Sequence, residues 1–426
     1  MKFIIRFPWH GFCTSVIGET LMHKILNRKK KTSDFTGKPE EENMSFKISK
    51  PQKEIQKAAR DFAKGEFDKD LAFDMERAQK FPEDVRNKAA GLGFIGIHYP
   101  EEYYGAGLGI LENVLLAEEF CKKDSSMGIG LMLSGFAAEC ILRFGTDSLK
   151  DRFLSGIASG EMLSGEAFTE SVSGYDTGDI KTWAQKKEDA WIINGQKTLV
   201  TNGGKAGVYC VLCRTDPGSI GADGISMILA EGNSEGLLSV NPRDKLGMRM
   251  VSTSDLVFNN VKVPCSNLVG KQGKGVLQAL AFYDEARILL SAMALGTARG
   301  AFLRALDYVR QRELFGKKLA GFQVTRHKLA DMAMGINIAE HLVYEVAADF
   351  DSGRSDSGRI AMAGLSACQA AIDVSSEAIQ LLGGYGYMAE YELERFYRDA
   401  KSMGIFLGNT GMMKDIIAKN IIEKIK

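Results

Sequence analysis

The sequence lacks an excess of charge of one sign and lacks long apolar runs. Its 426 residues carry 54 Lys and Arg against 54 Asp and Glu, so the formal net charge is zero. Nucleic-acid binders normally present a clustered basic face, and a membrane-spanning helix needs ~20 consecutive apolar residues. We therefore expect neither a nucleic-acid partner nor a membrane span. The content of 45% hydrophobic and 25% charged residues indicates a globular protein.

Cysteine and histidine are few and are not grouped. The seven cysteines are odd in number and show no disulfide framework, which favours buried thiols in a reducing compartment. Cys210 and Cys213 form a close pair within a run that predicts a β-strand. Three positions apart in a strand, their thiols point to opposite faces, so a zinc or redox pair is not expected. The five histidines are scattered, and we expect no metal site.

Residues 1–43 differ in character from the rest of the chain. A basic run at 28–31 is followed by an acidic patch that includes residues 41–42, and the apolar part near residues 3–17 is too interrupted for a signal-peptide core. We interpret this segment as an extension that is disordered, serves targeting, or precedes a start at Met44. We expect a cytoplasmic protein, or one of the mitochondrial matrix if its source is eukaryotic.

Helical periodicity predicts an N-terminal domain over residues 44–165. Ile55, Ala59 and Phe62 fall on one helix face. Pro82 followed by two acids predicts a helix start. The glycines of residues 105–109 lack dinucleotide-binding spacing and follow no strand, so they predict a loop.

A period of two predicts a β-domain over residues 166–275. Asn194-Gly195, between the apolar runs 191–193 and 196–200, predicts a hairpin with a tight turn. Further strands are expected at 208–213, 225–229 and 255–263. Short strands separated by frequent turn signals indicate an antiparallel barrel or sandwich.

The C-terminal part, residues 276–426, again has helical periodicity. Four long stretches are expected at 276–311, 323–351, 358–382 and 393–424. The predicted fold class is α+β, with a helical domain, a β-domain and a four-helix bundle in that order.

Several segments, in order, resemble the acyl-CoA dehydrogenase family of flavoproteins over residues 44–426. Residues 166–176 and 194–204 resemble the two flavin loops of that family. The other matching segments are Lys245–Arg249, Asn260–Pro264, Arg312–Gly316, Phe322–Gln323, Gln380–Tyr387 and Arg395–Lys401. The resemblance implies an FAD-dependent oxidation of an acyl-CoA thioester, with electrons passed to an electron-transfer flavoprotein.

The resemblance assigns cofactor contacts to both flavin loops and to the C-terminal bundle. Thr201 would place its hydroxyl near flavin N5. The other matched cofactor positions are Phe168, Thr169, Gly174, Tyr175, Leu199, Arg312, Phe315, Gln323, Gln380, Gly384 and Asn409. In the family, the residues matching Arg312, Phe315, Gln380 and Gly384 contact the FAD of a neighbouring subunit, which implies a homo-tetramer or dimer. Taken singly, each residue also fits a purely structural role.

Two positions in the flavin loops depart from the family pattern. Leu199 stands where tryptophan is usual, so the ring that stacks against the flavin is missing. Tyr175 stands where a small serine is usual. Both changes would reshape the cavity beside the flavin without abolishing binding. The resemblance also places acyl-CoA near Tyr175, Met132, Asp284, Arg287 and Phe406.

The usual catalytic carboxylate is absent from its expected position. Removal of a proton beside a thioester normally needs a positioned base, which in the family is a Glu followed by Gly-Thr. Here Leu407 occupies that position. Some relatives instead place the Glu directly before the arginine that matches Arg287, but Ala286 stands there. Glu285 lies one residue earlier, about 100° around a helix, and it is our candidate for a non-standard base.

A third arrangement resembles anaerobic relatives that act on cyclohexane-carboxyl-type CoA esters through an aspartate of the N-terminal half. The matching stretch, residues 127–138, contains no acid, although Asp124 and Glu139 flank it. Leu131, Met132 and Leu133 within it are expected to line an apolar slot for the acyl group, or to be plain helix core.

Three hypotheses about function stay open at this point. The first is an acyl-CoA dehydrogenase with a non-standard base. The second is related flavin and thioester chemistry, such as alicyclic 1,4-dehydrogenation, desulfination or reduction, which the joint loss of the tryptophan and the glutamate favours somewhat. The third is a catalytically silent FAD-binding subunit, against which the persistence of Thr201, Arg312 and Gln380 argues.

Overall fold

The structure is a computed structural model that describes residues 48–174, 176–406 and 408–424. Tyr175 and Leu407, which the sequence marks as departures from the family pattern, lie outside the described residues, as does the extension of residues 1–43. The chain divides into two compact units, residues 1–45 and 46–426, and everything below concerns the second.

The N-terminal part of this unit is helical, as predicted. Its helices are α2 (Lys50–Glu66), α3 (Lys69–Ala78), α4 (Glu83–Gly91), α5 (Ile110–Lys123), α6 (Ser125–Met132), α7 (Ala138–Phe144) and α8 (Asp147–Ala158). Pro82 precedes the first residue of α4, so the predicted helix start is confirmed. The glycines of residues 105–109 form a loop, also as predicted, and Gly109 caps the almost wholly buried helix α5.

The middle part is one mixed sheet of eight strands. They are β1 (Ser164–Ala167), β2 (Trp183–Lys187), β3 (Ala190–Thr201), β4 (Val208–Arg214), β5 (Ile225–Glu231), β6 (Leu237–Val240), β7 (Thr253–Pro264) and β8 (Leu268–Val269). Their order is β6-β7-β3-β2-β4-β5-β8, with β1 paired to β4 beside that path. Most pairings are antiparallel, as expected, but β1 and β2 each pair with β4 in parallel.

The predicted hairpin at Asn194-Gly195 is wrong. β3 runs without interruption through both residues, and its register with β7 shifts between Ile193 and Gly195. Gly195 has φ +143° and is packed so closely against Thr182 that a Cβ would meet its Oγ1 at 2.5 Å. The dipeptide therefore forms a β-bulge, which uses the same glycine freedom as a turn. The real turn lies between β2 and β3, where Glu188 has φ +52°.

Cys210 and Cys213 point to opposite faces of the sheet, as their spacing predicts. Cys210 faces the core shared with the helices, whereas Cys213 faces the core on the other side of the sheet. Both are buried free thiols.

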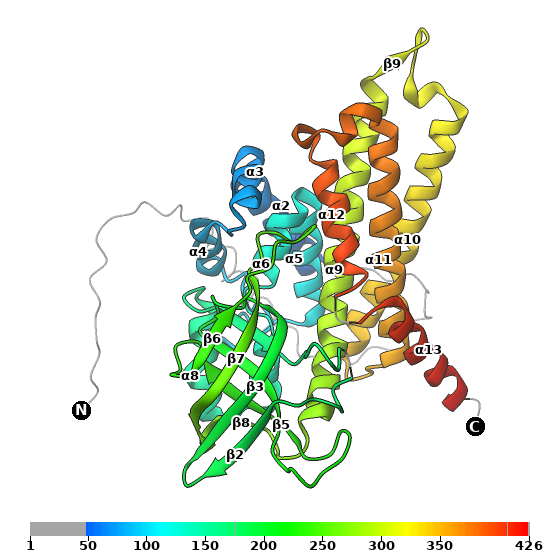
Figure 1. Ribbon diagram of the computed structural model, residues 1–426. Coiled ribbons are helices and arrows are strands. Elements are labelled where there is room, and N and C mark those ends of the chain that lie inside the picture. Colours follow the sequence, from blue (N-terminus) through cyan, green and yellow to red (C-terminus); the bar gives the residue numbers. More distant parts are fainter. Residues whose placement is uncertain (1–47, 175, 407, 425–426) are drawn as a thin grey trace, which may run out of the picture. The chain divides into compact units, whose positions relative to one another are not determined.

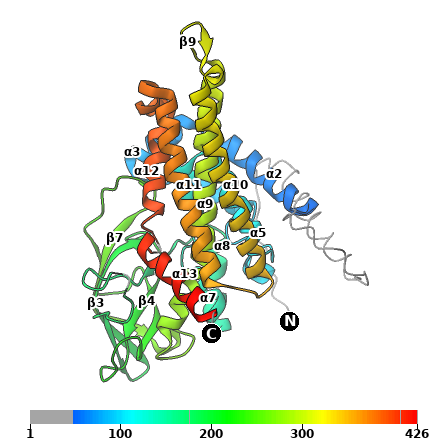
Figure 2. The same cartoon turned by 90° about the vertical axis from the view of Figure 1, so that its right-hand side faces the viewer.

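The C-terminal part is built from α9 (Gly275–Gln311), α10 (Gln323–Asp351), α11 (Ser357–Leu382), α12 (Leu393–Met403) and α13 (Thr410–Lys424). The fourth predicted stretch is thus two helices. Figures 1 and 2 show α9, α10, α11 and α12 side by side. A hairpin of β9 (Glu313–Leu314) and β10 (Lys317–Lys318) projects beyond the ends of α9 and α10.

Helix α9 is the central element of this bundle. It packs against α5, α10, α11 and α12. Within the described ranges, it is the one helix long and apolar enough to cross a membrane by length and composition. Its most apolar stretch is 78% buried inside the fold, as expected for the core helix of a bundle.

Candidate active site

A cavity of about 270 Å³ opens where the sheet meets the C-terminal bundle. Glu166 of β1 and Leu199 and Thr201 of β3 form the sheet side of this cavity, and Tyr283 of α9 forms part of the helical side. The remaining lining residues are Lys245, Leu246, Gly247, Met248, Val251, Thr253, Lys401, Ser402, Ile405 and Phe406. Elements that lie far apart in the sequence therefore meet around one opening.

Close packing fixes the sheet side of the cavity. A Cβ on Gly165 would meet the carbonyl oxygen of Thr201 at 2.6 Å, so glycine lets β1 lie directly beside β3. The side-chain Nδ2 of Asn202 donates to the carbonyls of Ser164, at 2.8 Å, and of Leu133, at 2.7 Å. These contacts hold the positions of Glu166 and Thr201 against the end of α6 with little freedom.

The opposite wall is held by a buried aspartate. Asp399 of α12 accepts hydrogen bonds from Ser126 of α6, at 2.6 Å, and from the backbone nitrogen of Met248, also at 2.6 Å. Burial raises the pKa of Asp399, and these hydrogen bonds oppose that rise. The loop of residues 245–251 is thereby tied to the bundle.

Glu166 is a buried carboxylate on the cavity wall, only 9% exposed. The hydroxyl of Tyr283 donates to its Oε1 at 3.1 Å. Burial raises the pKa of Glu166 to about 7, although the Tyr283 hydrogen bond and the charge of Lys197 lower it. Within the described part of the chain, it is the one carboxylate that lines this cavity.

The structure brings together three residues that the sequence assigned to the site. Leu199, Thr201 and Phe406 all line the cavity. Leu199 is 58% exposed and has φ +55°, so its side chain stands at the opening.

The segment of residues 166–176, which resembles the family's first flavin loop, begins within β1. Phe168 is buried against the rings of Phe282 and Tyr283, and its carbonyl accepts from Lys197 at 2.9 Å. The carbonyl of Thr169 accepts from the backbone nitrogen of Thr198 at 2.9 Å, which joins the two flavin loops. Gly174 is exposed and has φ +56°.

Asp284 and Arg287 form a partly buried ion pair one helical turn apart on α9. Their closest atoms, Nη1 and Oδ1, are 3.2 Å apart, and Ser357 donates its hydroxyl to the other carboxylate oxygen at 2.5 Å. Burial raises the pKa of Asp284, which these two partners oppose. Neither residue lines the 270 Å³ cavity.

Glu285 lies elsewhere, in a separate polar cluster. Arg143 of α7 donates to its Oε2, and its Oε1 lies 3.9 Å from His98. Burial raises the pKa of Glu285 despite the nearby Arg143. Together with Met132 and Glu139, it lines a small cavity of about 20 Å³ that does not include Thr201. The structure does not bring Glu285 to the cavity that Thr201 lines.

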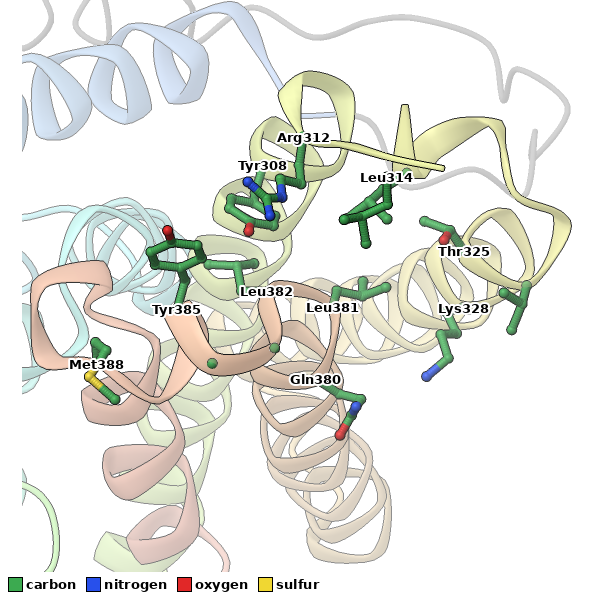
Figure 3. A pocket seen from close by; sticks show the side chains of 14 residues that line it. Tyr308, Arg312, Leu314, Thr325, Lys328, Gln380, Leu381, Leu382, Tyr385 and Met388 are labelled. Carbon is green, nitrogen blue, oxygen red and sulfur yellow. The ribbon is translucent and has the colours of Figure 1, made fainter. Parts of the chain in front are cut away.

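A second large pocket, of about 650 Å³, lies at the ends of α9, α10 and α11 (Figure 3). Arg312, Gln380 and Gly384 line it, as do Tyr308, Tyr385 and Lys328. A Cβ at Gly383 or at Gly384 would meet no atom within 4 Å, so this backbone is open to approach. A guanidinium, an amide and accessible backbone suit a phosphate-bearing ligand.

Beyond residues 168–174, three further predicted cofactor positions also line neither pocket. Phe315 is 92% exposed in the turn between β9 and β10, and Gln323 is exposed at the start of α10. Asn409 caps α13 by accepting from the backbone nitrogen of Met412 at 3.0 Å. These positions can contact a cofactor only if it extends beyond the two pockets of one chain.

Sequence reasoning missed Glu166 and Tyr283 as a pair. A signal for Glu166 was available, because an acid between Gly165 and Ala167 in a wholly buried strand is costly unless it has a purpose. Nothing in the sequence pairs it with a tyrosine 117 positions away. The described residues contain no cluster of three or more His, Cys, Asp or Glu side chains that could hold a metal.

Comparison with known proteins identifies the class. The family profiles of the acyl-CoA dehydrogenase N-terminal, middle and C-terminal domains match residues 49–161, 165–261 and 273–422. The chain therefore belongs to the acyl-CoA dehydrogenase family. It is an oxidoreductase that acts on CH–CH groups, with the family's helical, β and helical architecture.

Individual relatives cover nearly the whole chain. It is 35% identical over 89% of its length to the NADH-dependent acryloyl-CoA reductase of Anaerotignum propionicum, of which 97% is covered. The structure of butyryl-CoA dehydrogenase from Megasphaera elsdenii matches 89% of this chain and 100% of its own, with TM-score 0.85 and 33% identity. A structure described as the electron transferring flavoprotein of Acidaminococcus fermentans matches 89% of this chain and 99% of its own, with TM-score 0.86 and 35% identity.

Proposed function

We propose that this protein binds FAD and oxidises the α,β carbon–carbon bond of an acyl-CoA thioester with a non-standard base. The observation that supports this most is the meeting of Thr201, Leu199 and Phe406 around one cavity at the junction of the sheet and the bundle. The resemblance independently assigns Thr201 and Leu199 to the flavin and Phe406 to the acyl-CoA.

The residues around the cavity fit the isoalloxazine of FAD. The two loops that the family uses for this ring are joined by the Thr198–Thr169 backbone hydrogen bond. The Thr201 side chain supplies a hydroxyl, while Leu199 and Met248 supply apolar surface. When bound, FAD accepts hydride from the substrate carbon β to the thioester. The protein's task is to orient the substrate, exclude water and move the proton.

The cofactor's phosphates and adenine fit a different pocket. Arg312, Gln380 and Gly384 surround the second pocket, which shares no lining residue with the first. We infer that this pocket of one chain receives the FAD of a neighbouring copy. The active protein is accordingly a homo-dimer or homo-tetramer, with Phe315 and Gln323 exposed for contact between copies.

The acyl group and its CoA fit the residues of α6 and α9. Met132, Phe136 and Phe282 line the cavity of about 20 Å³ that Glu285 also lines, and the ring of Phe136 packs against Phe406 at 5.3 Å between centroids. The acyl chain would lie against the rings of Phe136 and Phe406, outside that small cavity, and the Asp284–Arg287 pair would lie toward the CoA.

Electrons would pass to an electron-transfer flavoprotein. A structure described by that name is among the chain's structural matches. The related reductase from Anaerotignum propionicum favours a second candidate function, reduction of an enoyl-CoA. The same residues would serve both directions, because each step of a reversible reaction uses the same groups.

The proposal is tested on purified full-length protein by FAD reconstitution followed by anaerobic acyl-CoA titration. We expect a yellow protein whose flavin is bleached by at least one of a panel of straight, branched and alicyclic acyl-CoAs, with a product two mass units lighter. A protein that does not retain FAD, or a flavin untouched by the whole panel, would contradict it.

A paired substitution tests the shared FAD site. Arg312→Ala should weaken FAD binding roughly 10- to 100-fold, as expected for losing charged hydrogen bonds to phosphate. Arg310→Ala, an exposed change two residues earlier on α9 that does not line the pocket, should leave FAD binding unchanged. Equal losses in both variants would contradict the assignment of the pocket.

A further inference from the structure

We propose that Glu166, held in place by the hydroxyl of Tyr283, is the group that exchanges a proton with the carbon next to the thioester carbonyl. This inference rests on the proposed function, because it names the base that the acyl-CoA reaction requires. It replaces Glu285 as the candidate.

The placement of Glu166 is the first support. Its carboxylate lines the same cavity as Thr201, which is assigned to the flavin, and Phe406, which is assigned to the acyl-CoA, so both ligands would meet beside Glu166. The close packing of Gly165 on Thr201 fixes β1, and Tyr283 fixes one carboxylate oxygen at 3.1 Å. The Tyr283 hydroxyl engages only the Oε1 atom of this carboxylate.

The other buried acids near α9 are already engaged. Glu285 accepts a hydrogen bond from Arg143 and lies near His98, beside a separate cavity. Asp284 accepts hydrogen bonds from Arg287 and Ser357. Although burial raises the pKa of both acids, each arginine opposes that rise and occupies a carboxylate oxygen.

The surroundings of Glu166 suit proton exchange near neutral pH. The titratable groups that act on it or share its cavity are Tyr283 of α9, Lys197 of β3, Cys140 of α7, Cys210 of β4, and Lys245 and Lys401 of the cavity wall. Lys197 already binds Glu170 at 2.8 Å. With burial outweighing these charges, the pKa of Glu166 rises to about 7, which is where a general base works best.

The proposed step is a proton transfer alone. The α C–H bond of the thioester breaks and an O–H bond forms on Glu166. The electron pair of the broken bond delocalises onto the thioester carbonyl as an enolate. No electrons are gained or lost, so the step needs no oxidant, and its reverse delivers a proton to the α-carbon in the reductive direction.

This step can be followed without measuring flavin turnover. Full-length FAD-loaded protein is incubated anaerobically with butyryl-CoA in D2O, and deuterium at the α-carbon of the recovered thioester is measured by mass spectrometry. Wild type should incorporate deuterium, and Glu166→Gln should be slower by roughly 100-fold or more. FAD content and melting temperature, measured on the same samples, report whether the variant is folded.

The outcomes separate the two proposals. If wild type neither exchanges α-protons nor is bleached by any acyl-CoA, the proposed function fails, and the role of Glu166 fails with it. If wild type does both and Glu166→Gln exchanges within about threefold of it, the function stands and Glu166 is not the base.

If Glu166→Gln folds poorly, a second variant, Tyr283→Phe, tests the proposal. Tyr283→Phe keeps the carboxylate but removes the hydrogen bond that favours its charged form, so the pKa of Glu166 should rise. The midpoint of the pH profile of deuterium exchange should therefore move to higher pH. An unchanged midpoint with active exchange would mean that the titrating base is a different group.

Discussion

Two buried glutamates in this fold each accept a hydrogen bond from a tyrosine of another element, yet their surroundings differ. Glu118 of α5 pairs with Tyr344 of α10, and Arg299 of α9 lies 2.8 Å from its other oxygen. Glu166 of β1 pairs with Tyr283 but borders a cavity. Among the described residues, no arginine forms an ion pair with it. Burial raises the pKa of both.

The comparison teaches how to tell a structural acid from a reactive one. A buried charge is tolerated when an opposite charge compensates it, as Arg299 does for Glu118. Such a pair joins three helices and has no opening for a ligand in the cavities described above. Glu166 has only the more distant influence of Lys197 and borders open space, so its proton is free to move to a ligand.

The largest effect is expected when the positive charge that compensates Glu118 is removed. Arg299→Met should lower the free energy of unfolding at pH 7 by about 3 kcal/mol, because it leaves Glu118 buried without its counter-charge. Urea unfolding measures the loss. The double variant Arg299→Met with Glu118→Gln should recover part of it, since no unpaired charge remains. A single variant that loses less than about 1 kcal/mol would mean that the pair is merely a surface ion pair.

A comparable effect should appear in the pH dependence of stability at Glu166. Its folded pKa, about 7, lies above the ordinary 4.5. Between these values the folded state binds the extra proton, so stability falls as pH rises through this window. At about 1.4 kcal/mol per pH unit, the loss is roughly 3 kcal/mol by pH 8. Glu166→Gln should lack this loss.

The measurement compares urea unfolding of wild type and Glu166→Gln at pH 5 and pH 8. The variant should gain stability relative to wild type at the higher pH. That gain is expected of a reactive group kept at the expense of stability. Parallel changes in the two proteins would indicate that Glu166 has an ordinary pKa.

The smallest effects should come from the two tyrosine hydroxyls. Tyr344→Phe should cost about 1 to 2 kcal/mol of unfolding free energy, because it removes a hydrogen bond to a charged acid. Tyr283→Phe should cost less than that at pH 6, where Glu166 is mostly neutral. Thermal unfolding at pH 6 compares the two variants, and a larger loss of stability for Tyr283→Phe would mean that Glu166, not Glu118, is the acid held mainly in its charged form.

The helices were predictable because their apolar spacing is long and regular. The stretches 323–351 and 276–311 agree with α10 and α9 almost to the residue. The hairpin predicted at Asn194-Gly195 is wrong because a β-bulge and a tight turn both need the backbone conformations that glycine allows. Only the pairing of β3 with β7 distinguishes the two. Gly404 and Gly408 in the last stretch mark a break between α12 and α13 that periodicity alone did not show.

The site was predictable where it depends on matched motifs and not where it depends on packing. Thr201 and Arg312 line cavities, while their contacts with FAD stay a prediction of the resemblance. Glu285 was proposed from spacing along one helix, but Arg143, from a different element, decides what it does. Glu166 lies in a segment that resembles the family, yet the role proposed for it depends on a tyrosine that only the folded chain brings near.

The most direct test compares the two glutamates in one assay. Glu118→Gln and Glu166→Gln remove the same charge from the same kind of tyrosine pair, so both are subjected to α-deuterium exchange of butyryl-CoA. We expect Glu118→Gln to exchange at the wild-type rate and Glu166→Gln to be slower by roughly 100-fold or more. Equal rates in the two variants would contradict the assignment of Glu166 as the proton-exchanging group.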